Sequence, residues 1–242
     1  MMSFTMQNIG LVHSCFREKF GIPRQPGLVP EARAEIEILP PYDQDEAFNG
    51  LDDFSHLWVI FVFHQCLRKK WKATVRPPRL GGNRRVGVFA SRATFRPNPI
   101  GLSVVKFDGM ARRQGHLYLQ ISGVDLLDGT PVLDLKPYLP YADSLPQALG
   151  GYAPEAPQPF GPLLFSAEAE AQCQQYAQGY AGGYTQLRSL IVNLLQLDPR
   201  PAYRAHMRAG TQEIYAMRLL DFDLKWEIRG NEIYVLRLDS TG

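Results

Sequence analysis

Two prolines separated by a single residue constrain this chain more than any other feature, because regular structure cannot continue through them. They are Pro97 and Pro99, within the segment 87–103, which reads GVFASRATFRPNPIGLS. Each proline fixes its own φ and lacks an N–H, and each keeps the preceding residue out of the α region. We therefore predict a stiff loop at the tip of a kinked β-hairpin, between strand-like runs at 86–90 and 101–107.

This loop also carries three long polar side chains within seven residues, namely Arg92, Arg96 and Asn98. A rigid backbone with carbonyls that lack ladder partners is suited to ligand recognition. The alternative is an ordinary proline-rich turn between two strands. The local sequence leaves both interpretations open.

The first 140 residues read as a β-rich domain. Ile36 and Ile38 alternate with glutamates, and 117–122 shows the same period of two, which is typical of half-buried strands. The run 57–63 is apolar throughout, as expected for a strand covered on both faces. The segment 43–50 suggests one short capped helix. Many strands separated by Gly and Pro turns favour a barrel or a curled sheet.

The chain then changes character. We predict a β-barrel-like domain over 1–142, a Pro- and Gly-rich linker over 143–162, and a small α+β domain over 163–242. In the last of these, a polar helix, an amphipathic helix and two strands are expected at 166–178, 187–194, 221–228 and 233–238. The fold class is therefore mainly β, with a small α+β unit after it.

Composition sets broad limits on function. A net charge of +2 over 242 residues does not imply strong non-specific nucleic-acid binding, although basic residues cluster over 68–85. Three cysteines without C-x-x-C spacing make a disulfide framework unexpected. No signal peptide is recognised, and the run 57–63 is too short to cross a bilayer. We expect a cytoplasmic protein that does not bind membranes.

Most familiar catalytic patterns do not occur. The sequence has no G-x-G-x-x-G loop after a strand and no Walker A loop, which disfavours a Rossmann-type nucleotide site. It has no G-x-S-x-G elbow, so Ser103 reads as a strand residue and Cys66 as a small buried side chain. His56, His64 and Cys66 suggest a metal pair without a convincing third ligand, so we expect no metal site.

Several long motifs, in a fixed order, carry a family resemblance. They are KFGIPRQPG at 19–27, FSHLWVIFVFHQ at 54–65, RPPRLGGN at 76–83, the segment 87–103, DGTPVLDLKPY at 128–138 and DPRPAYR at 198–204. Together they run nearly from end to end of the chain. The sequence resembles the TsaA-like (YaeB) family, whose characterised bacterial members are tRNA methyltransferase O enzymes.

The resemblance implies S-adenosylmethionine as the cofactor, held on a non-Rossmann scaffold. Side-chain amides and turn backbone would read the adenine, Arg92 would hold the methionine carboxylate, and Leu102 would pack against the purine. The acidic turn at Asp128 would lie near the sulfonium, although Asp-Gly-Thr-Pro by itself reads as a tight turn. The implied cofactor residues are Pro23, Arg24, Gln25, His64, Gln65, Arg92, Leu102, Asp128, Gly129, Thr130 and Pro131.

The resemblance also implies the substrate. It predicts N6 methylation of N6-threonylcarbamoyladenosine, 3′ of the anticodon in threonine-type tRNAs, by a homodimer; the residues themselves single out no general base. Stacking and phosphate contacts would hold the anticodon loop. The candidates are Arg84, Arg85, Arg96, Asn98, Lys136, Tyr138, Arg200, Tyr203 and Arg204. The alternatives are a non-catalytic RNA-binding module and, on weaker grounds, a metal-dependent hydrolase.

Overall fold

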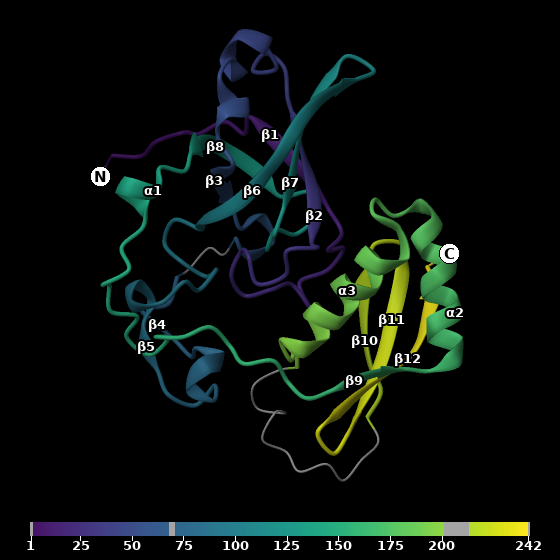
Figure 1. Cartoon of the computed structure of the whole chain (residues 1–242). Helices are drawn as coiled ribbons and strands as arrows, with labels where there is room; N and C mark the ends of the chain where they lie inside the picture. The colour runs from purple at the N-terminus through teal and green to yellow at the C-terminus, as the bar shows by residue number, and fades with distance from the viewer. Residues whose placement is uncertain (1, 68–70, 201–212, 242) are drawn as a thin grey trace.

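The computed structural model describes residues 2–67, 71–200 and 213–241, and these form two large β-sheets, a small two-stranded sheet and short helices around them (Figure 1). The N-terminal sheet contains β1 (Gly10–Ser14), β2 (Arg33–Ile38), β3 (His56–Val62), β6 (Ile100–Arg113), β7 (His116–Ser122) and β8 (Pro131–Pro137). The C-terminal sheet contains β9 (Leu163–Phe165), β10 (Tyr215–Leu219), β11 (Phe222–Arg229) and β12 (Glu232–Ser240). The mainly β prediction is confirmed.

The N-terminal sheet curls until its last strand meets its first, in the order β1-β2-β7-β6-β3-β8. The seam between β1 and β8 is short, with register pairs only at Gly10↔Val132 and Leu11↔Pro131. Inward-facing side chains of β2, β3 and β7, such as Ile36, Leu57 and Leu119, are completely buried. The sheet is therefore barrel-like in its curvature, with a narrow seam along one side.

A close contact inside this sheet explains why a glycine begins the strand after the prolines. Gly101 lies opposite Phe61 in the antiparallel pair β3–β6. A Cβ on residue 101 would lie 2.2 Å from Cζ of the Phe61 ring. Because no side chain fits in that space, Gly101 allows the aromatic ring to fill the interior of the sheet.

The proline-rich segment is not a hairpin tip, so this part of the prediction is wrong. The strand before the loop, β5 (Val86–Gly87), pairs with β4 (Thr74–Val75) in a separate two-stranded sheet. The strand after the loop, β6, pairs with β3 and β7. The loop therefore connects two different sheets, and 88–90 forms a 3-10 turn (η5, Val88–Ala90) instead of continuing the strand.

Two further local predictions need correction. β3 is fully buried on one face only, and its other face is half-buried. On that half-buried face, the Trp58 indole donates to Asp143 of the short helix α1 (Pro140–Asp143) at 2.9 Å. The segment 43–50 contains the 3-10 turn η1 (Asp45–Phe48) instead of an α-helix, and a second 3-10 turn, η2 (Leu51–Asp53), follows it; neither has a side-chain cap bond. Two more such turns are η3 (His64–Cys66) and η4 (Pro78–Leu80).

The C-terminal unit contains the two predicted helices and the two predicted strands, and its sheet has two further strands, β9 and β10, that were not predicted. Helix α2 (Ala167–Tyr176) begins where the Ser166 hydroxyl accepts a hydrogen bond from the Ala169 amide at 2.9 Å, and the turn η6 (Ala177–Gly179) follows it. Helix α3 (Gly183–Gln196) buries the predicted apolar face, including Leu187, Leu190, Ile191 and Leu194. The strands of the sheet follow the order β10-β11-β12-β9, and β9 is parallel to β12. In the described part of the chain, no helix has the length and apolar character needed to cross a bilayer.

The segment after β1 joins the two units. Phe16 forms an antiparallel bridge with Leu219 of β10, and the Leu220 amide donates to the Cys15 carbonyl at 2.8 Å. The Phe20 ring stacks on Trp226 of β11 with centroids 6.0 Å apart. Helix α3 lies between the two sheets (Figure 1). One continuous hydrophobic core therefore connects both units, so the C-terminal unit directly supports the N-terminal loops.

Candidate functional site

The proline-stiffened loop is held in shape from within by one of its own arginines. The Arg96 guanidinium donates to the carbonyls of Val88, Ser91 and Ala93 at 3.3, 2.7 and 3.5 Å. These are carbonyls that the sequence predicted to lack ladder partners. Arg96 therefore satisfies the loop backbone, whereas Arg92, four residues earlier, is exposed and projects toward another segment.

Arg92 meets the segment that carries the Pro-Arg-Gln motif. Its guanidinium donates to the side-chain carbonyl of Gln25, and the Gln25 amide nitrogen in turn donates to the Arg24 carbonyl. Two residues further along, the Gly27 amide donates to the Gly123 carbonyl at 2.8 Å. The loops around residues 25, 92 and 123 are thus fastened together, although they are far apart in the sequence.

A buried carboxylate faces this junction. The Ser103 hydroxyl, inside the curled sheet, donates to Asp125 at 2.6 Å. Burial raises the pKa of Asp125 to about 6, while the Ser103 hydrogen bond and the positive charge of Arg92 oppose that rise. Asp125 therefore takes up a proton more readily than an ordinary aspartate but is mostly ionised at neutral pH, with Arg92 as its cationic neighbour.

The Asp-Gly-Thr-Pro turn is positioned by β1 and the residues after it. Asp128 accepts the Ser14 amide at 2.9 Å and forms an ion pair with Arg17. Its own amide and that of Gly129 donate to the carbonyls of Phe16 and Val12, at 2.9 and 2.8 Å. Thr130 is buried, with its hydroxyl on the Leu127 carbonyl at 2.6 Å. Both oxygens of Asp128 are thus already engaged within the protein.

His64 and Gln65 follow the end of β3, which lies beside the start of β8. The register pair Phe61↔Val132 brings the His64 turn close to Pro131. Lys19 donates to the Gln65 carbonyl at 2.8 Å. Partial burial, together with the nearby Lys19 charge, lowers the pKa of His64, so its imidazole is neutral at neutral pH.

Leu102 presents an apolar surface next to these groups. It lies on β6 between Gly101 and Ser103, and because side chains alternate along a strand it points outward while Ser103 points inward. Leu102 is 52% exposed, and Ile100 and Phe89 are also exposed. Leu102 can therefore contact a flat apolar ligand without any rearrangement of the core.

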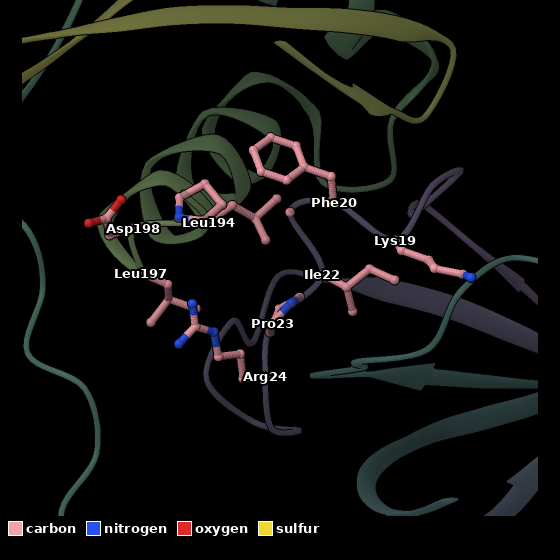
Figure 2. Close-up of a pocket in the computed structure, with 10 residues that line it drawn as sticks. Lys19, Phe20, Ile22, Pro23, Arg24, Leu194, Leu197 and Asp198 are labelled. Carbon is pink, nitrogen blue, oxygen red and sulfur yellow. The ribbon is translucent and has the colours of Figure 1, made fainter. Parts of the chain in front are cut away.

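Pro23 and Arg24 lie on the other side of their loop. Figure 2 shows them with Phe20 and Ile22, around a cavity beside Leu194 and Leu197 at the end of α3. Burial lowers the pKa of Arg24, an effect that Asp198 opposes and Arg79 reinforces. The Pro-Arg-Gln motif therefore divides: Gln25 joins the Arg92 cluster, and Arg24 lines a cavity between the two units.

The predicted tRNA-contacting residues do not form one group. Lys136 and Tyr138 lie at the far end of β8 from Pro131, beside Trp58 and His56. Arg84 and Asn98 are exposed, Arg85 donates to Thr74 at 3.0 Å, and Arg96 is used within its loop. Arg200 forms an ion pair with Asp198 at 2.7 Å. Tyr203 and Arg204 lie outside the described residues.

The geometry disfavours the predicted alternative that needs a metal. His56 begins β3 and His64 follows its end, so the two rings are separated by a seven-residue strand, roughly 20 Å at the usual rise per residue. Within the described ranges, no group of three His, Cys, Asp or Glu side chains could hold a metal ion. Cys66 is only half-buried, so its interpretation as a small buried side chain is wrong.

Three residues of this site were not identified from the sequence. The sequence indicates only a strand position for Ser103, and it assigns no role to Asp125 or Arg17. Their roles depend on contacts across 22 and 111 positions of sequence, which no local pattern reveals. The available signal was a serine on the inward side of an apolar strand, together with an acidic residue between buried leucine and valine side chains.

Comparisons with known proteins cover the whole chain. The family model described as the tRNA-methyltransferase O N-terminal domain matches residues 11–144, and the TrmO C-terminal domain model matches residues 159–241. The sequence is 47% identical over 238 residues to the tRNA (adenine(37)-N6)-methyltransferase of Escherichia coli K12, covering 98% of this chain and 99% of that protein. It is 49% identical over 225 residues to a putative S-adenosylmethionine-dependent methyltransferase, RcsF, of Pseudomonas aeruginosa, covering 93% of each. A crystal structure of TrmO from Pseudomonas aeruginosa superposes with a TM-score of 0.80 at 40% identity, over 99% of each chain.

Proposed function

The chain belongs to the tRNA-methyltransferase O family, and we propose that it methylates N6 of adenine 37 in tRNA when that adenine carries a threonylcarbamoyl group. It is an S-adenosylmethionine-dependent tRNA (adenine-N6)-methyltransferase; one full-length relative is named a tRNA (adenine(37)-N6)-methyltransferase and another a putative S-adenosylmethionine-dependent methyltransferase. The threonylcarbamoyl substrate, and its occurrence in threonine-type tRNAs, rest on the motif resemblance.

The observation that carries this proposal is the convergence of Gln25, Arg92 and Asp125, together with the exposed Leu102 on the outer face of β6, next in sequence to the Ser103 that binds Asp125. S-adenosylmethionine has a carboxylate, a cationic sulfonium and a flat purine. A guanidinium, a carboxylate and an apolar surface are the complementary groups. Arg92 and Asp125 supply the first two from neighbouring loops, and Leu102 supplies the third from strand β6. The residues present therefore fit the cofactor.

Each of these residues has a distinct task in the proposed site. Arg92, aligned by Gln25, would bind the carboxylate of the methionine moiety, and Leu102 would pack against the purine. Asp128 and the Thr130 backbone would close the side of the site nearest His64 and Gln65. S-adenosylmethionine supplies an electrophilic methyl group when bound. Rigid loops of this kind favour catalysis by holding reactants in line, for which effective molarities reach about 10⁵ M or more.

The tRNA would be held by residues at the edge of this site. Arg84, Arg85 and Asn98 lie on exposed segments before and within the proline-stiffened loop, where they can reach phosphates and splayed bases. Lys136 and Tyr138 lie along the same curled sheet but at its other end, so they would contact a more distant part of the RNA. Arg96, by contrast, would act through the shape of its loop.

We expect a homodimer, as the resemblance implies. The outer face of β3 and β6 has exposed or half-exposed apolar side chains, among them Leu102, Ile100 and Ile60. Exposed apolar patches on a folded protein commonly mark association surfaces. Light scattering coupled to size-exclusion chromatography would give twice the monomer mass of 27.3 kDa. A monomer at micromolar concentration would contradict this expectation.

Methyl transfer from radiolabelled S-adenosylmethionine to tRNA tests the proposal. Labelling should require tRNA that carries the threonylcarbamoyl group, and it should map to adenine 37. Equal labelling of unmodified tRNA would mean that the substrate is wrong. Absence of any labelling, together with no calorimetric signal for the cofactor, would instead support the non-catalytic RNA-binding alternative.

A further inference from the structure

Two adjoining cavities form a single groove between the N-terminal and C-terminal units. One has a volume of about 200 Å³ and the other about 410 Å³, and both are lined by Arg24, Leu197 and Asp198. The larger cavity continues to Gln158, Phe160 and Arg200. We call these two cavities together the interdomain groove. It has the size of a small-ligand site, but it is open and elongated.

The positive charges at this groove are not neutralised by carboxylates. Arg79, next to the lining residue Pro78, donates to the Glu155 carbonyl at 2.6 Å, and Lys19 donates to the Gln65 carbonyl. A carbonyl satisfies a donor without cancelling its charge. Neither Lys19, Arg24 nor Arg79 forms an ion pair with any carboxylate among residues 2–67, 71–200 and 213–241.

The carboxylate in the groove already has a cationic partner within the protein. Asp198 is the one carboxylate among the described lining residues, and Arg200 engages both of its oxygens, at 2.7 and 2.9 Å. Arg200 also lies over the Phe160 ring, 5.2 Å from its centroid. The charges of Asp198 and Arg200 cancel one another. Arg24, Arg79 and Lys19 therefore leave the groove with an excess of positive charge.

We propose that the interdomain groove binds the sugar–phosphate backbone of the tRNA, adjacent to the nucleotide that is methylated. Uncompensated arginines in a concave surface are suited to phosphodiesters, and proline and phenylalanine side chains along the groove offer apolar contact to ribose and base faces. The position of the groove fits this role, because Arg24, which lines the groove, directly precedes Gln25, which accepts a hydrogen bond from Arg92. The groove therefore begins one residue from the cofactor site. The inference rests on the proposed function.

Removing Arg79 tests the groove most directly, because this residue belongs to no cofactor contact. In Arg79→Ala, the Kd for tRNA in filter binding should rise about tenfold, as expected for a lost bond to a charged group. The slope of log K against log salt should fall by about 0.7 for one single-stranded phosphate contact. The matched control is Arg113→Ala, which removes an equally exposed arginine, paired with Glu35 at the end of β6.

A charge insertion provides a second variant that preserves side-chain shape. Gln158 is exposed on the edge of the groove, so Gln158→Glu adds one negative charge with no change in size. The Kd for tRNA should rise several-fold, whereas the calorimetric Kd for S-adenosylmethionine should equal that of the wild type. Gln158→Ala should bind tRNA within about twofold of the wild type, since it changes no charge.

The outcomes separate this inference from the proposed function. If wild-type protein methylates tRNA but Arg79→Ala and Gln158→Glu bind tRNA as tightly as Arg113→Ala, the groove is not an RNA site. A loss of cofactor affinity equal to the loss of tRNA affinity would assign the groove to the cofactor and overturn the inference. If wild-type protein transfers no methyl group, the proposed function fails, and tRNA binding by these variants still tests the groove.

Discussion

The loop cluster around Arg92 and the interdomain groove use arginine in opposite ways. In the cluster, Arg92 is aligned by Gln25, Arg96 by three carbonyls and Arg17 by Asp128. In the groove, neither Arg24 nor Arg79 forms an ion pair with a carboxylate in the described part of the chain. An arginine fixed by polar partners is prepared for one small ligand of defined shape, whereas unneutralised arginines along an open groove suit a flexible polyanion.

The largest effect is expected on cofactor affinity in the loop cluster around Arg92. Arg92→Ala should weaken S-adenosylmethionine binding by about 3 kcal/mol, roughly a hundredfold in Kd, because the cofactor carboxylate loses its charged partner. Isothermal titration calorimetry measures the change. Arg92→Lys keeps the charge but loses the bidentate geometry, so its Kd for S-adenosylmethionine should lie between those of the wild type and Arg92→Ala. An unchanged Kd in Arg92→Ala would remove Arg92 from the site.

Asp125→Asn tests the buried carboxylate through the pH dependence of stability. In the folded protein the pKa of Asp125 is raised to about 6, from an ordinary value of 3.8, so the folded state holds this proton more tightly than the unfolded chain does. The contribution of Asp125 to the free energy of unfolding must therefore fall as pH rises from about 4 to about 6 and stay low above that. The asparagine variant lacks this titration.

Urea unfolding at several pH values gives the comparison. Between pH 4 and pH 7, the wild-type stability should fall relative to that of Asp125→Asn by at most about 3 kcal/mol, since one pKa unit corresponds to about 1.4 kcal/mol. Asparagine can still accept the Ser103 hydrogen bond, so folding should be preserved. Parallel stability curves for the two proteins would show that Asp125 is not buried as a titrating acid. A more stable but less active variant would indicate that the carboxylate is kept for function.

Arg96→Ala should loosen the prepared loop without removing a ligand contact. Three loop carbonyls lose a charged donor, and we expect the unfolding free energy to decrease by about 1–2 kcal/mol. Cofactor affinity should fall less than in Arg92→Ala, because Arg92 and Gln25 remain. Chemical denaturation and calorimetry measure the two effects. If affinity falls as far as in Arg92→Ala, Arg96 contacts the cofactor directly.

The smallest effect is expected at the exposed ion pair between Arg17 and Asp128. Its side chains are 44% and 28% accessible, and pairs in such surroundings contribute about 0–1 kcal/mol to stability. Arg17→Ala should therefore leave the melting temperature nearly unchanged. Cofactor affinity should fall modestly, because the Asp128 turn keeps its backbone bonds to Phe16 and Val12. A large loss of stability would contradict the assignment of this pair as a local orienting contact.

Local sequence determined much of this protein. The two prolines impose a stiff loop, period-two alternation defines β2 and β7, and the spacing of Leu187, Leu190, Ile191 and Leu194 places the buried face of α3. Each of these follows from the covalent properties of single residues or from the repeat of one element. The ordered motifs likewise carried the family assignment and its cofactor.

Tertiary structure alone decided how these parts meet. It paired β5 with β4, used Arg96 to satisfy the loop carbonyls, placed Asp125 between Ser103 and Arg92, and divided Arg24 from Gln25 across two surfaces. These outcomes depend on which distant groups share a buried space. Burial and long-range charge set the partners of a polar side chain, and neither can be read from the period of a single strand or helix.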